Sequence, residues 1–204
     1  MDEMVMRSIA KWPNVPSVYG WLRLDRRGDW LVRMPASVPG GAPRFDRIRN
    51  PAVVEFIGRN YARDAEGRYY FQNGPQRVYV SLDCTPWVYR LDDSGAALVA
   101  QNGARAGTPR AAFFDERDAL VLDCDHGPGV VADRDLAAIA ERFADAAGRP
   151  LDPESLFERV RSGERVEAQW MGAPLAVAGI DSGELPARFG FVAHPAPPPG
   201  EPDC

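Results

Sequence analysis

The sequence predicts an α+β protein made of two tandem units, each a bent antiparallel sheet, or half-barrel, packed on a helix. Short apolar runs alternate with turn-forming residues along most of the chain, which is typical of β-hairpins. The same order of strand, helix, hairpin and strand occurs over residues 28–91 and again over residues 111–192. Three D-x-x-G segments, which supply turns between strands, begin at Asp25, Asp64 and Asp92.

This repeated order sets the expected domain boundaries. We expect the first unit to span residues 1–91 and the second to span residues 92–192. Residues 193–204 read AHPAPPPGEPDC, and a Pro-rich segment of this kind has too few apolar side chains to bury a core. We therefore expect a disordered tail after the second unit.

The first unit begins with two strands, SVYGWLRL and WLVRM, joined by a turn, and the Pro- and Gly-rich residues 35–43 form a loop. Asn50 offers an N-cap followed by a proline, and apolar residues at helical spacing predict a helix over 51–62. Residues 69–82 read YYFQNGPQRVYVSL, two alternating runs around an Asn-Gly corner, which predicts a hairpin.

The second unit continues with strand pairs. WVYRL and AALVA pair across DDSG, and AAFF and ALVLDC form a further hairpin. A helix is predicted from Asp133 to Gly148, and a shorter one over SLFERVRS follows the cap Asp152. RVEAQW and PLAVAGI predict the last hairpin, and a strand follows around ARFGFV.

Composition narrows the class of protein. The chain has 204 residues, 45% of them hydrophobic and 26% charged, and it lacks the ~20 consecutive apolar residues that span a bilayer. Its acidic start does not resemble a signal peptide, so we expect a cytoplasmic protein with no membrane association. The three cysteines are widely spaced without a CxxC pair, which suggests neither a disulfide framework nor a zinc ribbon. No cofactor is expected.

Charge is distributed unevenly between the two halves. Residues 1–91 carry 14 Lys or Arg against 9 Asp or Glu, a net charge of +5, whereas residues 92–204 carry 10 against 20, a net charge of −10. In the first half, Arg residues alternate with Tyr residues, a pattern that nucleic-acid and phosphate sites use for ion pairing and stacking. Nucleic-acid or phosphate binding is therefore one alternative, although net acidity disfavours it and an exposed strand face gives the same pattern.

One segment resembles a known family. The residues that carry the resemblance are Gly28 and Trp30, Ile48 and Arg49, Gly67, Tyr69 and Tyr70, and finally Val78, Val80, Asp83, Pro86 and Trp87. They are similar to the motifs of a family of uncharacterised proteobacterial proteins, a domain of unknown function with two tandem α/β half-barrel motifs. The resemblance implies two half-barrels of bent sheet wrapped on helices and a role in signalling, and it carries no catalytic residues to transfer.

The sharpest local pattern for chemistry is ALVLDCDHGPG. It delivers Asp123 and Asp125 from the end of an apolar strand, with His126 beside them, and such side chains hold divalent cations. The strand followed by D-x-D also resembles the nucleophile loop of haloacid-dehalogenase-type phosphatases, but it lacks that family's later residues and alternating βα units. A metal-binding protein or metal-dependent hydrolase is therefore the second alternative, and a strand end entering a turn is the structural interpretation.

The sequence as a whole favours binding over catalysis, because it shows no Walker loop, no G-x-G-x-x-G after a strand and no convincing Ser-His-Asp order. We expect a non-enzymatic regulatory or scaffold protein, monomeric or homodimeric, that recognises a protein partner or a small ligand. The residues expected to make that contact are Arg59, Arg63, Arg77, Tyr79 and Trp87.

Overall fold

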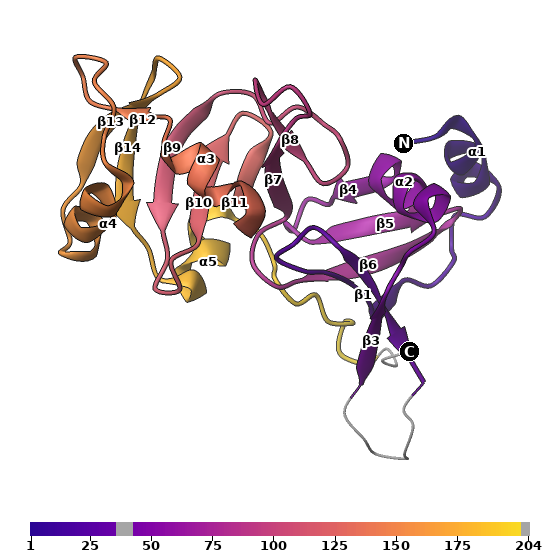
Figure 1. The fold of residues 1–204 in the computed structure, drawn as a ribbon. Helices are drawn as coiled ribbons and strands as arrows, with labels where there is room; N and C mark the ends of the chain where they lie inside the picture. The colour runs from indigo at the N-terminus through magenta and orange to yellow at the C-terminus, as the bar shows by residue number, and fades with distance from the viewer. Residues whose placement is uncertain (36–42, 201–204) are drawn as a thin grey trace. The chain divides into compact units, whose positions relative to one another are not determined.

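The computed structural model describes residues 1–35 and 43–200, and it shows an α+β protein with two sheets of six and eight strands (Figure 1). The predicted class is confirmed, and one of the sheets curls into a half-barrel. Both sheets are mixed, since each also contains parallel strand pairs that the sequence did not predict. No helix within these residues is long and apolar enough to cross a bilayer.

The first compact unit comprises Met1–Asp83 together with the chain from Gly190 onward. Its sheet has the strand order β3-β2-β1-β6-β5-β4. Its elements are α1 (Glu3–Lys11), β1 (Val18–Leu24), β2 (Trp30–Met34), β3 (Arg44–Arg47), α2 (Pro51–Arg59), β4 (Tyr61–Arg63), β5 (Tyr69–Asn73) and β6 (Gln76–Leu82).

Helix α2 covers one face of the first sheet (Figure 1). The Asn50 side chain caps it by accepting a hydrogen bond from the N–H of Ala52 at 3.0 Å, and the proline at N1 has no N–H to satisfy. Phe56 of the helix meets Phe71 of β5 edge to face, with ring centroids 5.5 Å apart. The predicted N-cap and start are confirmed, but the helix ends at Arg59 because the chain enters β4 at Tyr61.

The second compact unit comprises Cys84–Phe189. Its sheet has the strand order β12-β13-β14-β9-β10-β11-β7-β8. Its elements are β7 (Trp87–Leu91), β8 (Leu98–Ala100), β9 (Pro109–Phe114), β10 (Leu120–Cys124), β11 (Gly127–Val131), a 3-10 turn (Asp133–Asp135), α3 (Leu136–Ala140), β12 (Phe143–Ala144), α4 (Pro153–Arg161), β13 (Val166–Trp170), β14 (Ala173–Gly179), a second 3-10 turn (Ser182–Glu184) and α5 (Leu185–Phe189).

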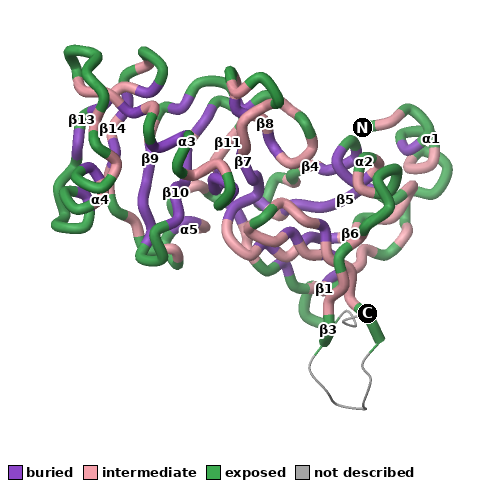
Figure 2. The backbone as a smooth tube through the Cα atoms, in the orientation of Figure 1, coloured by how far each residue is buried: buried purple, intermediate pink, exposed green. Residues whose placement is uncertain are grey.

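The core of the second unit lies against its central strands, which are buried over most of their length (Figure 2). Leu120, Val121 and Leu122 of β10 are fully buried, as expected for a strand covered on both faces. Helix α4 packs on β13 and β14, and α5 brings Phe189 to the ring of Phe113 at 5.9 Å between centroids.

The two sheets share a pairing scheme. In the first, β1 pairs with β2 antiparallel and with β6 parallel. In the second, β7 pairs with β8 antiparallel and with β11 parallel. In each sheet the parallel partner ends a three-stranded meander, which is β4-β5-β6 in the first and β9-β10-β11 in the second. The same strand arrangement thus occurs in both units.

One turn design joins many of these strands. The first Asp of each turn accepts hydrogen bonds through its side chain from main-chain N–H groups two to five residues later, as at Asp25, where the donors are Arg27 at 2.9 Å and Asp29 at 2.8 Å. The fourth residue has positive φ, which Gly tolerates best. The design occurs at the three predicted positions and at two further ones, so that the five begin at Asp25, Asp64, Asp92, Asp115 and Asp145.

Two predicted elements of the second unit are wrong. The helix expected from Asp133 to Gly148 is helical only at Leu136–Ala140, because Phe143 pairs with Trp170 in the sheet and the turn at Asp145 follows. In the strand expected around ARFGFV, residues 187–189 are instead the end of a helix, since Leu185 and Phe189 lie one helical turn apart and pack inward. Only Val192 makes an isolated β-bridge, to Arg68. Helix α1 and strands β3, β4, β11 and β12 were not predicted.

The boundaries of the units also differ from the expected ones. Strand β7 pairs with β8 and β11, so the division falls after Asp83 and not after residue 91. The chain returns to the first unit after α5, where the N–H of Leu82 donates to the carbonyl of Ala193 at 2.8 Å and Pro195 is buried. Part of the segment expected as a disordered tail is therefore packed. Most of the loop expected at 35–43 and the last four residues lie outside the described residues.

Candidate functional site

The residues expected to bind a partner are divided between the two units, four in the first and Trp87 in the second. Arg59, at the end of α2, pairs with Asp2 at 3.3 Å and with Glu55 at 2.6 Å. Hydrogen bonds from Asn60 and Arg59 lower the pKa of the Asp2 carboxyl. Arg63, on β4, donates to the carbonyl of Gly190. Both cations are used to hold parts of the first unit together.

Arg77 and Tyr79 belong to an aromatic cluster on the first sheet. Tyr79 is buried beside Tyr19 and Tyr70, and its hydroxyl donates to Asp64 Oδ2 at 3.1 Å. The Arg77 guanidinium lies 4.6 Å from the centroid of the Tyr70 ring. Burial raises the pKa of the Tyr79 hydroxyl. The structure therefore places Arg77 and Tyr79 in the same cluster. Neighbouring side chains already cover the aromatic rings of this cluster.

Trp87 belongs to the second unit and lies beside His126, with ring centroids 4.2 Å apart. It is buried, at 7% exposure. Burial lowers the pKa of the His126 imidazole and so favours the neutral ring. The neutral ring packs better against an apolar neighbour than the charged ring does. This pair closes the turn between β10 and β11.

The acidic side chains that were expected to bind a metal interact with other groups of the protein. Asp123 pairs with Arg110 at 3.2 Å. Asp125 Oδ2 accepts a hydrogen bond from the N–H of Thr108 at 3.0 Å. Within residues 1–35 and 43–200, no three His, Cys, Asp or Glu side chains are grouped so that they could hold a metal ion. The structure does not bring Asp123, Asp125 and His126 together as a ligand set.

The cation-rich first half is also largely paired with its own carboxylates. Arg68 binds Asp64 at 2.7 Å between Nε and Oδ2. Further ion pairs within the first unit join Arg23 to Asp83, Arg44 to Asp46 and Arg47 to Asp29. These contacts leave fewer free guanidinium groups for the phosphates of a nucleic acid.

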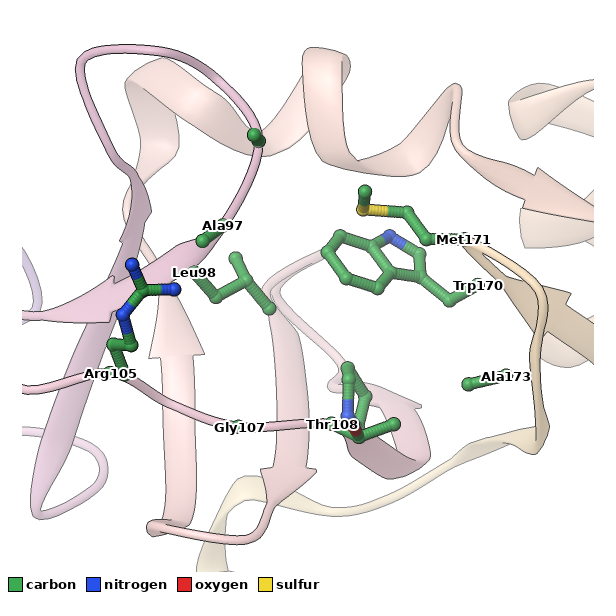
Figure 3. Close-up of a pocket in the computed structure, with 10 residues that line it drawn as sticks. Ala97, Leu98, Arg105, Gly107, Thr108, Trp170, Met171 and Ala173 are labelled. Carbon is green, nitrogen blue, oxygen red and sulfur yellow. The ribbon is translucent and has the colours of Figure 1, made fainter.

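The second unit contains a cavity that the sequence did not indicate (Figure 3). Its volume is about 300 Å³, at the lower end of the range typical of ligand sites. Three separate turns supply its walls: the end of the β7–β8 turn, the loop before β9 and the β13–β14 turn. The ten lining residues are Ala96, Ala97, Leu98, Arg105, Gly107, Thr108, Pro109, Trp170, Met171 and Ala173.

Trp170 forms the apolar wall of this cavity. It is 5% exposed, and its indole Nε1 donates to the carbonyl of Ile139 at 3.2 Å. That bond orients the ring, because it occupies the single donor of the indole. In Figure 3 the ring lies beside Met171 and opposite Leu98 and Arg105 across the cavity.

The loop that forms the floor depends on Asp125. Gly107 has a φ of 77°, and a Cβ placed there would lie 2.6 Å from Asp125 Oδ2. The same carboxylate accepts from the N–H of Thr108. Asp125, which the sequence indicated as a metal ligand, therefore holds the backbone at the edge of the cavity.

Met171 occupies an unusual backbone position at the rim. It has a φ of 49°, and with Gly172 at 84° it forms the two-residue turn between β13 and β14. Asn or Gly is preferred at the first position of such a turn, and a side chain like Met is rare in this conformation. Its side chain is 54% exposed. A flexible apolar side chain thus stands at the mouth of the cavity at some cost in backbone energy.

Two guanidinium groups lie at this rim. Arg105 is an exposed lining residue. Arg142 is placed by its Nε, which donates to the carbonyl of Ala138 at 3.1 Å, and its Nη1 lies 3.7 Å from the sulfur of Met171. Its Nη2 would be 3.6 Å from a Cβ added at Gly95, in the turn that continues into the lining residue Ala96.

A second cavity of about 370 Å³ lies elsewhere in the same unit. Two phenyl rings, Phe114 and Phe157, line it together with Arg161, which covers the Phe157 ring at 4.7 Å and pairs with Asp118 at 3.0 Å. Its carboxylates also have structural partners, since Glu116 accepts from the hydroxyl and the N–H of Ser182. Glu116 and Arg161, two charged residues of this cavity, are therefore each held by a structural partner.

Comparison with known proteins adds the family. No curated protein matches the chain. The crystal structure of a DUF1285 family protein from Silicibacter pomeroyi DSS-3 is similar to it, with 17% sequence identity and a TM-score of 0.45, over 74% of this chain and 90% of that chain. A family model described as "Protein of unknown function (DUF2946)" matches residues 1–196. The predicted resemblance to a domain-of-unknown-function family is confirmed, and the chain belongs to this family.

Proposed function

We propose that this protein is a non-enzymatic binding protein with a regulatory role, and that its second unit holds a small-molecule ligand in the cavity between Arg105, Trp170 and Met171. The observation that carries the proposal is Met171, an apolar side chain in a positive-φ position at the mouth of an apolar cavity. Unfavourable backbone conformations cost about 1–3 kcal/mol and cluster at ligand sites.

The lining supports binding of a mostly apolar ligand. Leu98, Pro109 and Trp170 present apolar surface, and the alanines leave room beside them. A water molecule occupies about 30 Å³ in the liquid, so the cavity has space for about ten water-sized groups. Apolar surface of this kind stabilises a ligand by about 25 cal/mol for each Å² that it removes from water.

The composition of the lining favours binding over acid–base chemistry. Its ten residues, all in the described part of the chain, offer one guanidinium, one hydroxyl and one thioether as polar side-chain groups besides the indole. General acids and bases are usually His, Asp, Glu, Lys, Tyr or Cys side chains. A guanidinium does not release its proton near neutral pH, so Arg105 serves recognition.

The test is a thermal-shift screen of the full-length protein against small organic molecules, with Met171→Asn as the companion variant. Asn suits the turn, so the variant is expected to unfold at the same temperature as wild type or slightly higher. A ligand at 100 times its Kd stabilises wild type by about 2.7 kcal/mol, which raises Tm by about 5–10 °C.

Met171→Asn is expected to keep the melting temperature of the free protein and to weaken ligand binding, so it separates folding from binding. We expect a compound that stabilises wild type to lose much of its shift in the variant, because the apolar rim is gone while the fold is kept. Ala173→Ser changes a lining residue without affecting the backbone conformation. As a control it is expected to reduce the ligand shift less than Met171→Asn does. A compound that stabilises both proteins equally binds elsewhere, and a screen in which every shift behaves in this way would contradict the proposal.

A further inference from the structure

The charges around the cavity in the second unit define the ligand further. Resting on the proposed function, we propose that the ligand is a small organic anion, an apolar body with one carboxylate, whose charge is bound by Arg105 and Arg142 and whose body lies against Trp170. The cavity joins the apolar wall of Trp170 to the guanidinium of Arg105 (Figure 3). Arg142 lies at the same rim, beside Met171. This combination matches a ligand with two chemically distinct ends.

Arg105 and Arg142 differ from most cations of this unit. Within the described residues, neither guanidinium lies within 4.0 Å of a carboxylate oxygen. Other arginines of the same unit are paired, as in Arg110 with Asp123, Arg149 with Asp145, Arg159 with Glu164 and Arg161 with Asp118. A guanidinium without a carboxylate partner keeps N–H groups available for charge-assisted hydrogen bonds to a ligand.

Two carboxylates beside this rim, Asp92 and Asp125, accept hydrogen bonds from other donors. Asp92 accepts from the Ser94 hydroxyl at 2.8 Å and from the N–H of Ala96 at 2.9 Å. These bonds, with a smaller contribution from the charge of Arg105, lower the pKa of the Asp92 carboxyl. Asp125 binds the N–H of Thr108. Asp92 is thus held by a hydroxyl and the backbone and Asp125 by the backbone, and among the described residues neither makes an ion pair with the arginines of the rim.

Arg142 is positioned for a second contact with the anion. Its Nε is held by the carbonyl of Ala138, whereas its Nη1 faces the Met171 sulfur, a weak acceptor. A carboxylate at the rim would replace this weak contact with a strong one. The flexible Met171 side chain would then cover the apolar end of the ligand, because methionine adapts its shape to a bound surface.

The experiment uses three probes of the same shape and different charge: 2-naphthoate, 2-naphthamide and 2-(aminomethyl)naphthalene. Their affinities for the full-length protein are measured by isothermal titration calorimetry at low and high salt. We expect the carboxylate to bind about 10- to 100-fold more tightly than the amide, with the difference shrinking at high salt, and the ammonium to bind most weakly.

Two variants assign the charge preference to the rim. Arg105→Gln and Arg142→Gln are each expected to weaken naphthoate binding about 10-fold or more while leaving naphthamide binding within about twofold. Arg165→Gln, an exposed arginine that pairs with Glu167 at 3.5 Å, is the matched control and should change neither affinity. Near-wild-type melting temperatures show that each variant is folded.

The outcomes separate the two proposals. Equal binding of the three probes, or naphthoate binding that both Gln variants leave unchanged, overturns the anion assignment. If the amide or the ammonium binds and Met171→Asn weakens it, the cavity is a ligand site of another charge class, and the proposed function stands without this inference. If no probe binds, both the anion assignment and this use of the cavity are overturned.

Discussion

The ring of Tyr79 stacks on the ring of Tyr19, with centroids 4.6 Å apart and an angle of 10° between the planes. Arg68 lies over Tyr79 at 4.7 Å, and Asp64 binds both the guanidinium of Arg68 and the hydroxyl of Tyr79. Burial alone would raise the pKa of the Asp64 carboxyl, but the hydrogen bonds from Arg68 and Tyr79 lower it. The contacts within this cluster stabilise one face of the first sheet.

The first prediction concerns Tyr79. Tyr79→Phe removes the hydroxyl from Asp64, which keeps its bonds to Arg68, so we expect a loss of about 1 kcal/mol in the free energy of unfolding. Tyr79→Ala also removes the stacked ring and should cost about 3–5 kcal/mol. Urea unfolding followed by circular dichroism measures both. Arg77→Ala, an exposed cation over Tyr70, should cost at most about 1 kcal/mol, and a larger loss than for Tyr79→Ala would refute this ranking.

The second prediction compares two glycines of one loop. Gly103 and Gly107 have nearly the same φ, 82° and 77°, but a Cβ at Gly103 meets nothing within 4 Å, whereas one at Gly107 meets the carboxylate of Asp125. Gly103→Ala should therefore cost about 1 kcal/mol from the backbone alone. Gly107→Ala should cost at least about 1 kcal/mol more, because it adds a steric clash.

A double variant tests this cause. Adding Asp125→Ala to Gly107→Ala removes the clashing carboxylate, so the double variant should be less destabilised than the sum of the two single changes. Thermal unfolding of the four proteins gives the coupling energy. Additive losses would show that Asp125 does not meet the substituted residue.

The third prediction concerns thiol reactivity. Burial raises the pKa of the Cys124 thiol to about 12, with Asp123 and Asp125 adding to the effect. At pH 8 only roughly one molecule in ten thousand carries the reactive thiolate. Iodoacetamide labelling followed by peptide mass mapping should leave Cys124 unmodified in the native protein and modify it in urea. Cys84, which is half-buried, is the internal comparison, and native labelling of Cys124 at the rate of Cys84 would contradict the assignment.

The fourth prediction is a pH dependence. Hydrogen bonds from the hydroxyl and N–H of Ser182 lower the pKa of Glu116 from 4.5 to about 2. A lowered carboxyl pKa stabilises the folded state above the unfolded value of about 4.5, and this contribution is lost as the pH falls from there to about 2. Glu116→Gln should therefore be less stable than wild type at pH 7, and the difference should shrink between pH 4.5 and pH 3.

Urea unfolding at several pH values measures that difference. Glu167→Gln, an exposed glutamate paired with Arg165, is the control and should show a smaller difference at pH 7. A gap between wild type and Glu116→Gln that stays constant down to pH 3 would show that the charge of Glu116 does not contribute to folding.

Local chemistry explains which parts of the fold could be predicted. The turns at Asp25 and Asp64 and the cap at Asn50 depend on residues within five positions of each other, and the sequence displays them directly. The prediction of a long helix after Asp133 is wrong because the deciding contact there is distant in the sequence. Its apolar spacing is helical, but Phe143 pairs with Trp170, a distant strand residue that the spacing does not reveal. The DAAG segment at Asp145 was the available signal, since it repeats the turn pattern.

The candidate site was harder to predict than the fold. Its walls come from three turns that are far apart in the sequence, around Leu98, Thr108 and Trp170, and no spacing rule connects them. A single local signal existed in Met171-Gly172, where a turn between two strands has Met in place of the usual Asn. The sequence predicted a contact surface that includes the aromatic residues Tyr79 and Trp87, but both are buried.

The return of the chain to the first unit has a consequence for biosynthesis. The N–H of Leu82 and the carbonyl of Gly67 receive their partners from Ala193 and Val192, more than a hundred residues later. A ribosome that has released only residues 1–83 has therefore supplied most of the first sheet but not its final hydrogen bonds. We expect the second unit, which is continuous in sequence, to complete its folding during translation, and the first unit to complete its own only after Val192 and Ala193 have emerged.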